Sequence, residues 1–302
     1  MIGPDRLDRV SADAVVPEQV IAYVRSVGES RPAMFGDCVG HLSVGEVVLI
    51  GYPLCAPEDA TAMSEAVELA LKTPELRKIT VIGPSRPPQA PERACSSRDG
   101  YHALPVPAAP PAGKLKNLLL RADRDLTLEQ GRRFDADHQK LVDRYLAERT
   151  LAAGTRHIFR QIPRYLEASP GSLMVSARRA DGRLAAFAVG EYASLHTALF
   201  MFCFRDPDVA PPGSADRVFS RLLEEAARRG QTRMNLGLGV NEGIRFFKRK
   251  WGAQPFLSCV ETGWELREPG LLSHLRGLLG RRERPPDKTS SQWGESSGEH
   301  EK

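Results

Sequence analysis

Apolar residues in the first third of the chain follow the patterns of several strands and one helix. Met63, Val67 and Ala70 recur at helical spacing before Pro74 ends the pattern, so a helix is expected there. Short apolar runs on both sides of this helix predict strands, and the three-residue gap between the first two suits a hairpin. These strands are expected at residues 36–42, 46–50 and 79–83, and residues 101–104 predict one more strand at a sheet edge.

Helical patterns return in the next segment. An apolar stripe with basic flanks covers residues 114–124. Thr127 and Gln130 have the spacing of a capping box, which predicts the start of a long helix. A further helix is expected at residues 157–167.

A three-stranded meander and a helix-rich segment complete the pattern. Asp181-Gly182 is a strong hairpin signal between the first two strands of the meander. Ser214 is the predicted N-cap of the next helix, which Gly230 ends. The remaining strands are expected at residues 172–177, 184–190, 196–204, 233–238 and within 256–266, with a short helix at 241–251.

Composition places these elements in a globular protein of about two domains. The chain has 302 residues, of which 41% are hydrophobic and 26% charged, and a domain holds roughly 150 residues. Eight prolines fall between Pro84 and Pro111, and this clustering indicates a boundary. From Glu283 onward the chain is polar and rich in Ser, Gly and charge, which predicts a disordered tail.

Several classes of protein and site are disfavoured. No apolar run approaches the roughly 20 residues that cross a bilayer, and the N-terminus lacks the features of a secretory signal, so a cytoplasmic location is expected. The five cysteines lie at least 17 positions apart, and they therefore predict neither a zinc site nor a disulfide framework. The net charge of +4 permits contact with phosphates without requiring it.

The order of elements in the second half resembles the GNAT fold of N-acyltransferases. Residues 236–253 also resemble the closing motif of the FemABX-like branch, in which a strand end with glycines is followed by a glycine, an aromatic-lysine pair and an aromatic-glycine pair. Here these are Gly243, Phe247-Lys248 and Trp251-Gly252. Residues 45–53 look like the opening of the C-terminal domain of lysylphosphatidylglycerol synthetases, which is another tandem member of the superfamily.

The resemblance implies a mixed α/β (α+β) fold, in which a GNAT-like mixed sheet is flanked by helices and two GNAT-like units stand in tandem. A partial unit is expected at residues 1–112, with a proline-rich seam at 84–111. The acyltransferase domain is expected at residues 113–270. A short helix and a disordered tail are expected at residues 271–302.

The resemblance also implies transfer of an acyl or aminoacyl group to an amine. It implies that Lys248 lies near the phosphates or the transferring ester of the donor, with a solvated basic helix face as the alternative. Glu191 and His196 flank the turn between two strands of the meander, and either is a candidate general base. A structural or exposed histidine is the competing interpretation of His196.

The donor site is implied around the helix that follows the meander, because a helix N-terminus offers unpaired amides to the pyrophosphate of coenzyme A. The candidate donor-binding residues are Gly213, Ser214, Ala215, Asp216, Asn235, Asn241, Phe247 and Trp251. Turn capping is the alternative for the two asparagines, and core packing is the alternative for the two aromatic residues. The usual Arg/Gln-x-x-Gly-x-Gly/Ala loop of the superfamily is missing, so acetyl-CoA or another acyl-CoA and aminoacyl-tRNA stay open as donors, and no metal is expected.

The acceptor and the partners are less defined. A small molecule, a lipid headgroup or a peptidoglycan precursor could supply the amine, and tRNA is a possible partner. The rival hypothesis is a non-catalytic GNAT-like module that binds RNA or a protein. Four arginines either form a phosphate-facing patch or pair with neighbouring acids, and pairing with Asp123, Asp125 and Asp135 is favoured. The arginines are Arg121, Arg124, Arg132 and Arg133.

Overall fold

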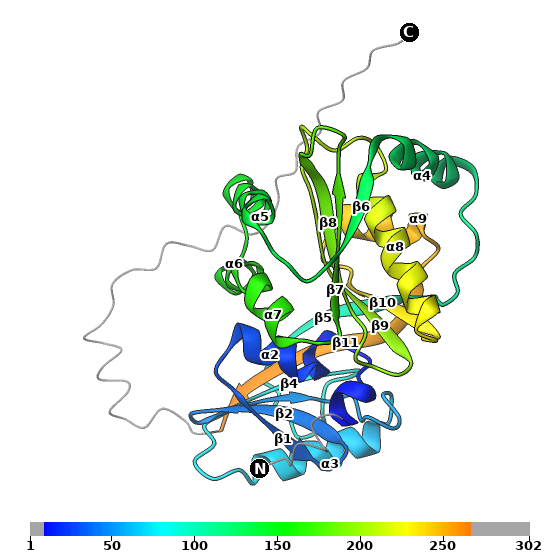
Figure 1. The fold of residues 1–302 in the computed structure, drawn as a ribbon. Coiled ribbons are helices and arrows are strands. Elements are labelled where there is room, and N and C mark those ends of the chain that lie inside the picture. Colours follow the sequence, from blue (N-terminus) through cyan, green and yellow to red (C-terminus); the bar gives the residue numbers. More distant parts are fainter. Residues whose placement is uncertain (1–8, 267–302) are drawn as a thin grey trace, which may run out of the picture. The chain divides into compact units, whose positions relative to one another are not determined.

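One mixed sheet organises the chain in the computed structural model, which describes residues 9–266. Eleven strands join in the order β1-β2-β3-β4-β11-β5-β10-β9-β8-β7-β6 (Figure 1). The predicted fold class, a mixed α/β sheet flanked by helices, is confirmed. The strands are β1 (Arg31–Phe35), β2 (Cys38–Ser43), β3 (Glu46–Ile50), β4 (Lys78–Gly83), β5 (Cys95–Pro105), β6 (Thr127–Gly131), β7 (Ser172–Arg178), β8 (Leu184–Glu191), β9 (Thr197–Arg205), β10 (Arg233–Leu238) and β11 (Gln254–Glu265).

Helices lie on both faces of this sheet. They are the 3-10 helix η1 (Pro17–Gln19) and the α-helices α2 (Ile21–Val27), α3 (Ala60–Leu71), α4 (Gly113–Asp125), α5 (Ala136–Glu148), α6 (Ala153–Arg160), α7 (Ile162–Ala168), α8 (Ser214–Arg228) and α9 (Glu242–Lys250). In the second half, α8 and α9 pack on one face, and α5 and α7 pack on the other. No helix of residues 9–266 is long and apolar enough to cross a membrane.

The hairpin and the crossover that follow β1 fold as the sequence predicts, whereas β1 itself was not predicted. β2 and β3 form the expected hairpin, and β3 pairs in parallel with β4 after the crossover through α3. α3 begins at Asp59, whose carboxylate accepts hydrogen bonds from the amides of Thr61 and Ala62. Its buried positions are Met63, Ala66, Val67 and Ala70.

The prediction of an edge strand at residues 101–104 is wrong. β5 lies inside the sheet, where it pairs antiparallel with β10 on one side and with β11 on the other. Pro105 is the last residue of the strand and stands opposite Arg233 of β10. β5, which precedes the expected division at residue 112, therefore pairs with two strands that follow it. The division itself stays a prediction.

The meander of β7, β8 and β9 is confirmed, and beyond it two parallel strands diverge. β9 and β10 pair in parallel over only three positions, from Thr197 with Arg233 to Leu199 with Asn235. Although β9 continues to Arg205 and β10 to Leu238, the two strands form no further pairs. Gly237 adopts a positive φ of 76° at this point, and the strands open into a gap that we call the splay.

Three predicted helix boundaries differ in the structure. Residues 127–131 form the edge strand β6, and α5 begins later, at the N-cap Asp135, because His138 supplies the capping box there. The expected helix at 157–167 divides into α6 and α7 at Gln161. Gly213, with φ of 90°, takes the N-cap position of α8, so Ser214 is its first residue. The tail expected at residues 271–302 lies outside the described residues.

Candidate active site

Lys248 reaches from α9 to the end of β10, beside the splay. The side chain is buried, with 2% of its surface exposed. Its ammonium donates hydrogen bonds to the carbonyl of Gly237 and, at 2.7 Å, to the carbonyl of Leu238. Burial lowers the pKa of Lys248 to about 8. An ammonium has three N–H donors, and with two used on backbone carbonyls one is left to face another group.

Two groups from β5 interact electrostatically with this ammonium, and the sequence pattern identified neither. Asp99 accepts hydrogen bonds from the amides of Gly100 at 2.7 Å and Gly239 at 3.0 Å, and its charge opposes the drop in the pKa of Lys248. His102 Nδ1 lies 3.1 Å from the carbonyl oxygen of Gly100. Burial and the Lys248 charge lower the pKa of His102. Only the pairing of β5 with β10 brings these residues together, and that pairing links distant parts of the chain.

The opposite face of the splay is covered by the N-terminal segment, which we define as residues 14–23. Asn235, at the last β9–β10 pair, donates to the carbonyl of Val15 at 2.8 Å and accepts from the amide of Gly237 at 2.8 Å. Val20 packs with Leu199 of β9. The candidate residue Asn235 therefore joins the N-terminal segment to the end of β10.

Glu18 joins the N-terminal segment to β5. Tyr101 donates its hydroxyl to Glu18 Oε2 at 3.0 Å, and Tyr101 stands opposite Leu238 in the β5–β10 register. Glu18 is half-buried, and this burial raises the pKa of its carboxyl group. No sequence motif marks Glu18, since its nearness to β10 depends on the course of the N-terminal segment.

The two residues expected to act as a base differ in environment. Glu191 is buried, and four groups donate to its carboxylate: the hydroxyls of Tyr165 and Ser169 at 2.6 Å and the amides of Tyr192 and Ala193 at 3.0 Å. Every oxygen of Glu191 is thus engaged in holding the turn after β8.

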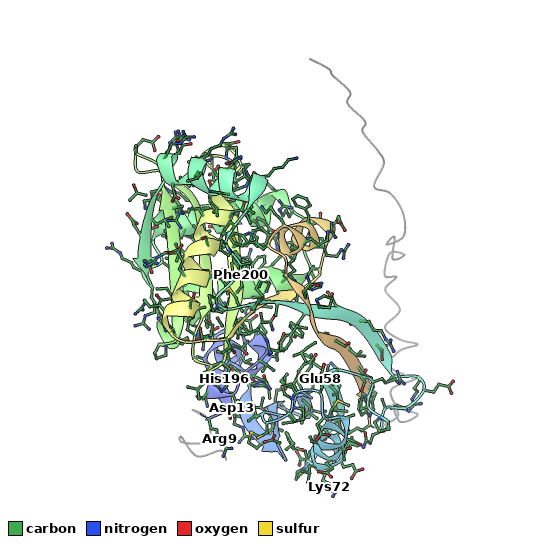
Figure 2. The ribbon with its side chains drawn as sticks, turned by 90° about the vertical axis from the view of Figure 1, so that its right-hand side faces the viewer. Arg9, Asp13, Glu58, Lys72, His196 and Phe200 are labelled. Carbon is green, nitrogen blue, oxygen red and sulfur yellow. The ribbon has the colours of Figure 1, made fainter. Side chains whose placement is uncertain are left out.

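His196 is exposed and precedes β9 at the end where β9 and β10 pair, so it does not meet Lys248 at the splay. Figure 2 shows His196 near Asp13 and Phe200 farther along β9, beneath α8 and α9. The neighbouring Leu195 donates its amide to the carbonyl of Ala12. The structure thus brings Lys248 and Asn235 together at one strand end and leaves Glu191 and His196 apart from them.

The N-terminus of α8 is closed by the chain itself. A Cβ built at Gly213 would meet the carbonyl oxygen of Leu118 at 2.6 Å, so α4 lies directly against this turn. Ser214 is fully buried, and its hydroxyl donates to the carbonyl of Pro211 at 2.6 Å. Beside the half-buried Ala215, the buried Asp216 already places a carboxylate at this positive end of the helix.

Aromatic side chains fill the space between α9, α8 and β9. Phe247 stacks on Phe200 with ring centroids 6.1 Å apart, and Phe219 meets both Phe247 and Trp251 edge to face. Trp251 also donates its indole N–H to Asp216 at 2.9 Å. Phe247 and Trp251 therefore pack in the core, and Asn241 caps α9 by accepting the amide of Ile244 at 2.9 Å.

These contacts do not fit the pyrophosphate of coenzyme A, which the GNAT fold implies at this helix end. The backbone of α4 occupies the approach, and the carboxylate of Asp216 would repel phosphate. The ammonium of Lys250 lies 2.5 Å from that carboxylate and is already paired with it.

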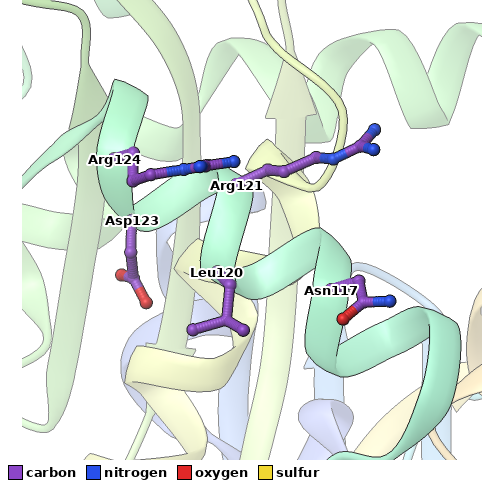
Figure 3. A pocket seen from close by; sticks show the side chains of 5 residues that line it. All are labelled: Asn117, Leu120, Arg121, Asp123 and Arg124. Carbon is purple, nitrogen blue, oxygen red and sulfur yellow. The ribbon is translucent and has the colours of Figure 1, made fainter.

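The arginines of α4 do not pair with the acids expected from the sequence. Asp123 binds Arg217 instead, and Asp135 binds Arg178 and His138. Arg121 and Arg124 form no ion pair with any residue in the range 9–266. They border a shallow hollow on α4, which Asn117, Leu120 and Asp123 also line (Figure 3).

A second buried polar group has the connectivity of a hydrolase triad. His138 lies 2.8 Å from Ser176 Oγ and 2.6 Å from Asp135 Oδ1. Ser176 is buried in β7, whose backbone pairs with β6 and β8 on its two sides. An oxyanion needs unpaired donors, and the strand has none there, so these residues serve to fix the start of α5 on the sheet.

Comparison with known protein families finds a match in the second half of the chain. Residues 114–249 match the acetyltransferase (GNAT) domain family. No curated protein sequence matches the chain.

Solved structures share the fold at low sequence identity. The chain is similar to FemX, with a TM-score of 0.58 and 9% identity over 92% of this chain and 98% of that one. It is similar to L-PGS from Bacillus licheniformis, with a TM-score of 0.56 and 14% identity over 93% and 98% of the two chains. A conserved protein of unknown function from Bacteroides thetaiotaomicron gives a TM-score of 0.60 and 12% identity over 87% and 96%. The resemblance predicted from the motif at residues 236–253 is confirmed at the level of the fold.

Proposed function

Because residues 114–249 match the acetyltransferase (GNAT) domain family, we propose that this protein transfers an acyl or aminoacyl group from an activated ester to an amine. The observation that carries the proposal is the buried ammonium of Lys248 at the point where β9 and β10 separate. Attack on an ester carbonyl places negative charge on its oxygen, and a preorganised cation with little water around it stabilises that charge strongly. Lys248 is the proposed catalytic cation, and its third N–H is the donor.

The donor that we propose is an aminoacyl ester, as in aminoacyl-tRNA, rather than an acyl-CoA. The closed α8 N-terminus and the aromatic packing leave no phosphate cradle for coenzyme A. An aminoacyl ester needs no such cradle, since only its ester group must reach Lys248. Among acceptors, the amines of small molecules, lipid headgroups and peptidoglycan precursors all fit this chemistry.

The test compares donors and a matched pair of lysine variants. The purified protein is incubated with bulk aminoacyl-tRNA carrying labelled amino acids, or with acetyl-CoA and longer acyl-CoAs, together with a panel of amines. We expect a labelled amide only with aminoacyl-tRNA, and a loss of about 100-fold or more in Lys248→Met. Lys140→Met, whose side chain is 79% exposed on α5, is the control and should keep full activity.

A thermal-shift measurement distinguishes the two donors by binding and requires no activity assay. A ligand bound at 100 times its dissociation constant stabilises a protein by about 2.7 kcal/mol, which raises the Tm of a domain of this size by about 5–10 °C. We expect no such shift with any acyl-CoA. A clear shift with acetyl-CoA would contradict the proposed donor.

A second candidate function is a non-catalytic module that binds RNA or a protein. The aromatic packing of Phe200, Phe219, Phe247 and Trp251 favours it, because it fills one side of the splay. Under this alternative no donor gives turnover, and binding of RNA weakens in Lys248→Met with a smaller dependence on salt.

A further inference from the structure

His102 of β5 lies on the same face of the sheet as α9, the helix that carries Lys248. Leu104, two positions along β5, packs in the core cluster that also contacts Phe247 of α9. Tyr101 belongs to a different cluster and bonds to the N-terminal segment on the other face. Because successive side chains of a strand point to opposite faces, His102 shares the face of Leu104 and of α9.

The pairing of β5 with β10 brings His102 beside a carbonyl that Lys248 binds. In the register of the two strands, His102 stands opposite residues 236–237 of β10. The carbonyl of Gly237 accepts a hydrogen bond from the Lys248 ammonium. The Lys248 charge also lowers the pKa of His102, as a cation near an imidazole does. Strand register and charge therefore place the ring next to the ammonium.

One ring nitrogen of His102 is fixed by a hydrogen bond, and the other is free. A carbonyl oxygen only accepts hydrogen bonds, so Nδ1, which lies 3.1 Å from the carbonyl oxygen of Gly100, carries the proton in the neutral ring. Nε2 is then unprotonated, and it has no hydrogen-bond partner among residues 9–266. The residue is half-buried, and Nε2 is not one of the buried polar atoms without a partner in that range. An incoming molecule can therefore reach Nε2.

We propose that His102 is the general base that takes a proton from the acceptor amine, and that the amine reaches the ester from the β5 side of β10. This assignment rests on the proposed transferase function. An ester carbonyl bound to the Lys248 ammonium lies next to the strand end that His102 faces, so an amine held at His102 can attack it. The donor then occupies the splay on the β9 side, and donor and acceptor meet over β10.

The step balances with these two side chains. The amine nitrogen forms a bond to the ester carbonyl carbon, and one N–H proton passes to Nε2 of His102. The Lys248 ammonium stabilises the negative charge on the carbonyl oxygen. The bond from the carbon to the ester oxygen then breaks, and the His102 imidazolium gives its proton to that leaving oxygen. The products are an amide and an alcohol, and both side chains return to their starting states.

The charge environment of His102 supports this role. Partial burial and the Lys248 charge lower its pKa, whereas the Gly100 hydrogen bond and the Asp99 charge oppose the drop. A histidine in an unfolded chain titrates at about 6.5, so the lowered pKa leaves the ring neutral near pH 7. The neutral ring is the form that accepts a proton.

The other neighbours of His102 in the described part of the chain add no unpaired charge. Pro255 stands opposite it on β11, and residues 236–237 of β10 are uncharged. Arg245 of α9 pairs with Glu242 and donates to a backbone carbonyl of the strand end. The protonation of His102 is thus set chiefly by its partial burial, by the cation of α9 and by the acid of its own strand.

His102→Asn is the variant that tests the assignment by activity. The asparagine Nδ2 takes the place of Nδ1 and can donate to the Gly100 carbonyl, so the strand should keep its structure while the base is lost. His157→Gln, at an exposed histidine of α6, is the matched control. The kcat is measured against pH with saturating labelled aminoacyl-tRNA, and the free-base form of the amine is kept saturating at each pH. The urea midpoint of each protein is measured alongside.

We expect His102→Asn to lower kcat by about 100-fold or more, to leave KM for the amine within a few-fold, and to remove the acid limb of the pH profile. His157→Gln should match the unaltered protein. A His102→Asn protein that keeps the acid limb overturns the assignment alone, whatever its rate. An unaltered protein that transfers nothing from any donor overturns the proposed function, and the assignment falls with it.

An NMR titration tests the placement of His102 without turnover. Its imidazole signal is identified by its absence in His102→Asn, and its pKa is compared among the unaltered protein, Lys248→Met and Asp99→Asn. Removal of the cation should raise the pKa of His102, and removal of the anion should lower it further. An unchanged pKa in both variants overturns the assignment even in an active enzyme. Both shifts in a protein without turnover would confirm the placement and assign the failure to the proposed function.

Discussion

Burial of the Lys248 ammonium lowers the free energy of unfolding by an amount that depends on pH. Its pKa in the folded protein is about 8 because burial disfavours the ammonium, whereas a lysine in an unfolded chain titrates at about 10.4. Between these values the unfolded chain binds more protons, so the folded state gains stability as pH rises. Below pH 8 both states are protonated, and the difference is constant.

The prediction compares the protein with Lys248→Met over this window. The free energy of unfolding of the unaltered protein, relative to the variant, should rise by about 3 kcal/mol between pH 8 and 10.4. Urea unfolding at intervals of half a pH unit measures it. Parallel curves for the two proteins would show that burial does not lower the pKa of Lys248.

Because Gly171 has no side chain, it leaves room for the carboxylate of Glu191. A Cβ built there would lie 2.0 Å from Glu191 Oε1 and 2.8 Å from the amide nitrogen of Ala193. Gly171→Ala must therefore displace the carboxylate that holds the turn after β8, and we expect a loss of about 2–4 kcal/mol in the free energy of unfolding.

The matched control for that change is Gly154→Ala, in α6, where a Cβ meets nothing within 4 Å. Alanine in a helix is more favourable than glycine by roughly 0.5–1 kcal/mol, so this variant should be slightly stabilised. Equal urea midpoints for the two variants would contradict the steric argument.

The sequence could indicate single site residues only where a motif carries them. Lys248 follows from the aromatic-lysine pair, whereas Asp99 and His102 stand in no motif. Their nearness to Lys248 arises from the pairing of β5 with β10, and this contact has no local signal. Glu191 was a candidate base because of its place beside a strand turn, but its carboxylate accepts four hydrogen bonds that hold that turn.

At the scale of elements, a buried carboxylate of α8 adds polar bonds to the aromatic packing that holds α9. Asp216 accepts the indole N–H of Trp251 and pairs with Lys250. Replacing it with alanine leaves the Trp251 N–H without an acceptor in the core. We expect Asp216→Ala to lower the free energy of unfolding by about 1.5–3 kcal/mol, and to speed hydrogen exchange of the amides of α9.

Exchange measured by mass spectrometry on peptides of α9 and α3 tests this expectation. The control variant Asp59→Ala removes the N-cap of α3 instead and should loosen only that helix, with a loss of about 1 kcal/mol. Faster exchange in α9 for both variants would contradict a local role of Asp216.

Elements with strong local signals were predictable, and elements decided by pairing were not. The Asp181-Gly182 hairpin and the strands that it joins match the structure because the turn is set by its own residues. Thr127 and Gln130 have the form of a capping box, yet their segment pairs with β7, and the capping box forms at Asp135 and His138. A helix cap and an exposed edge strand share polar residues, so the local sequence does not separate them.

At the scale of the molecule, the sheet joins parts of the chain that the proline-rich seam seemed to separate. β5 lies between β10 and β11, and β11 also pairs with β4 over six positions. Strands from both sides of residue 112 therefore alternate across the centre of the sheet. Breaking the covalent link there should leave the two parts bound to each other by these ladders.

The last prediction follows from this alternation. A protease site placed between the exposed residues Ala112 and Gly113 should allow cleavage of the native protein. We expect the two fragments to co-elute on size exclusion and to keep the circular dichroism of the uncleaved protein, because β5 and β11 each need a partner from the other fragment. After separation in denaturant, the fragment from residue 113 onward should fail to refold cooperatively, since β10 and β11 would expose unpaired edges. Mixing both fragments should restore the signal, whereas cooperative folding of the second fragment alone would show that β5 and β4 are dispensable for it.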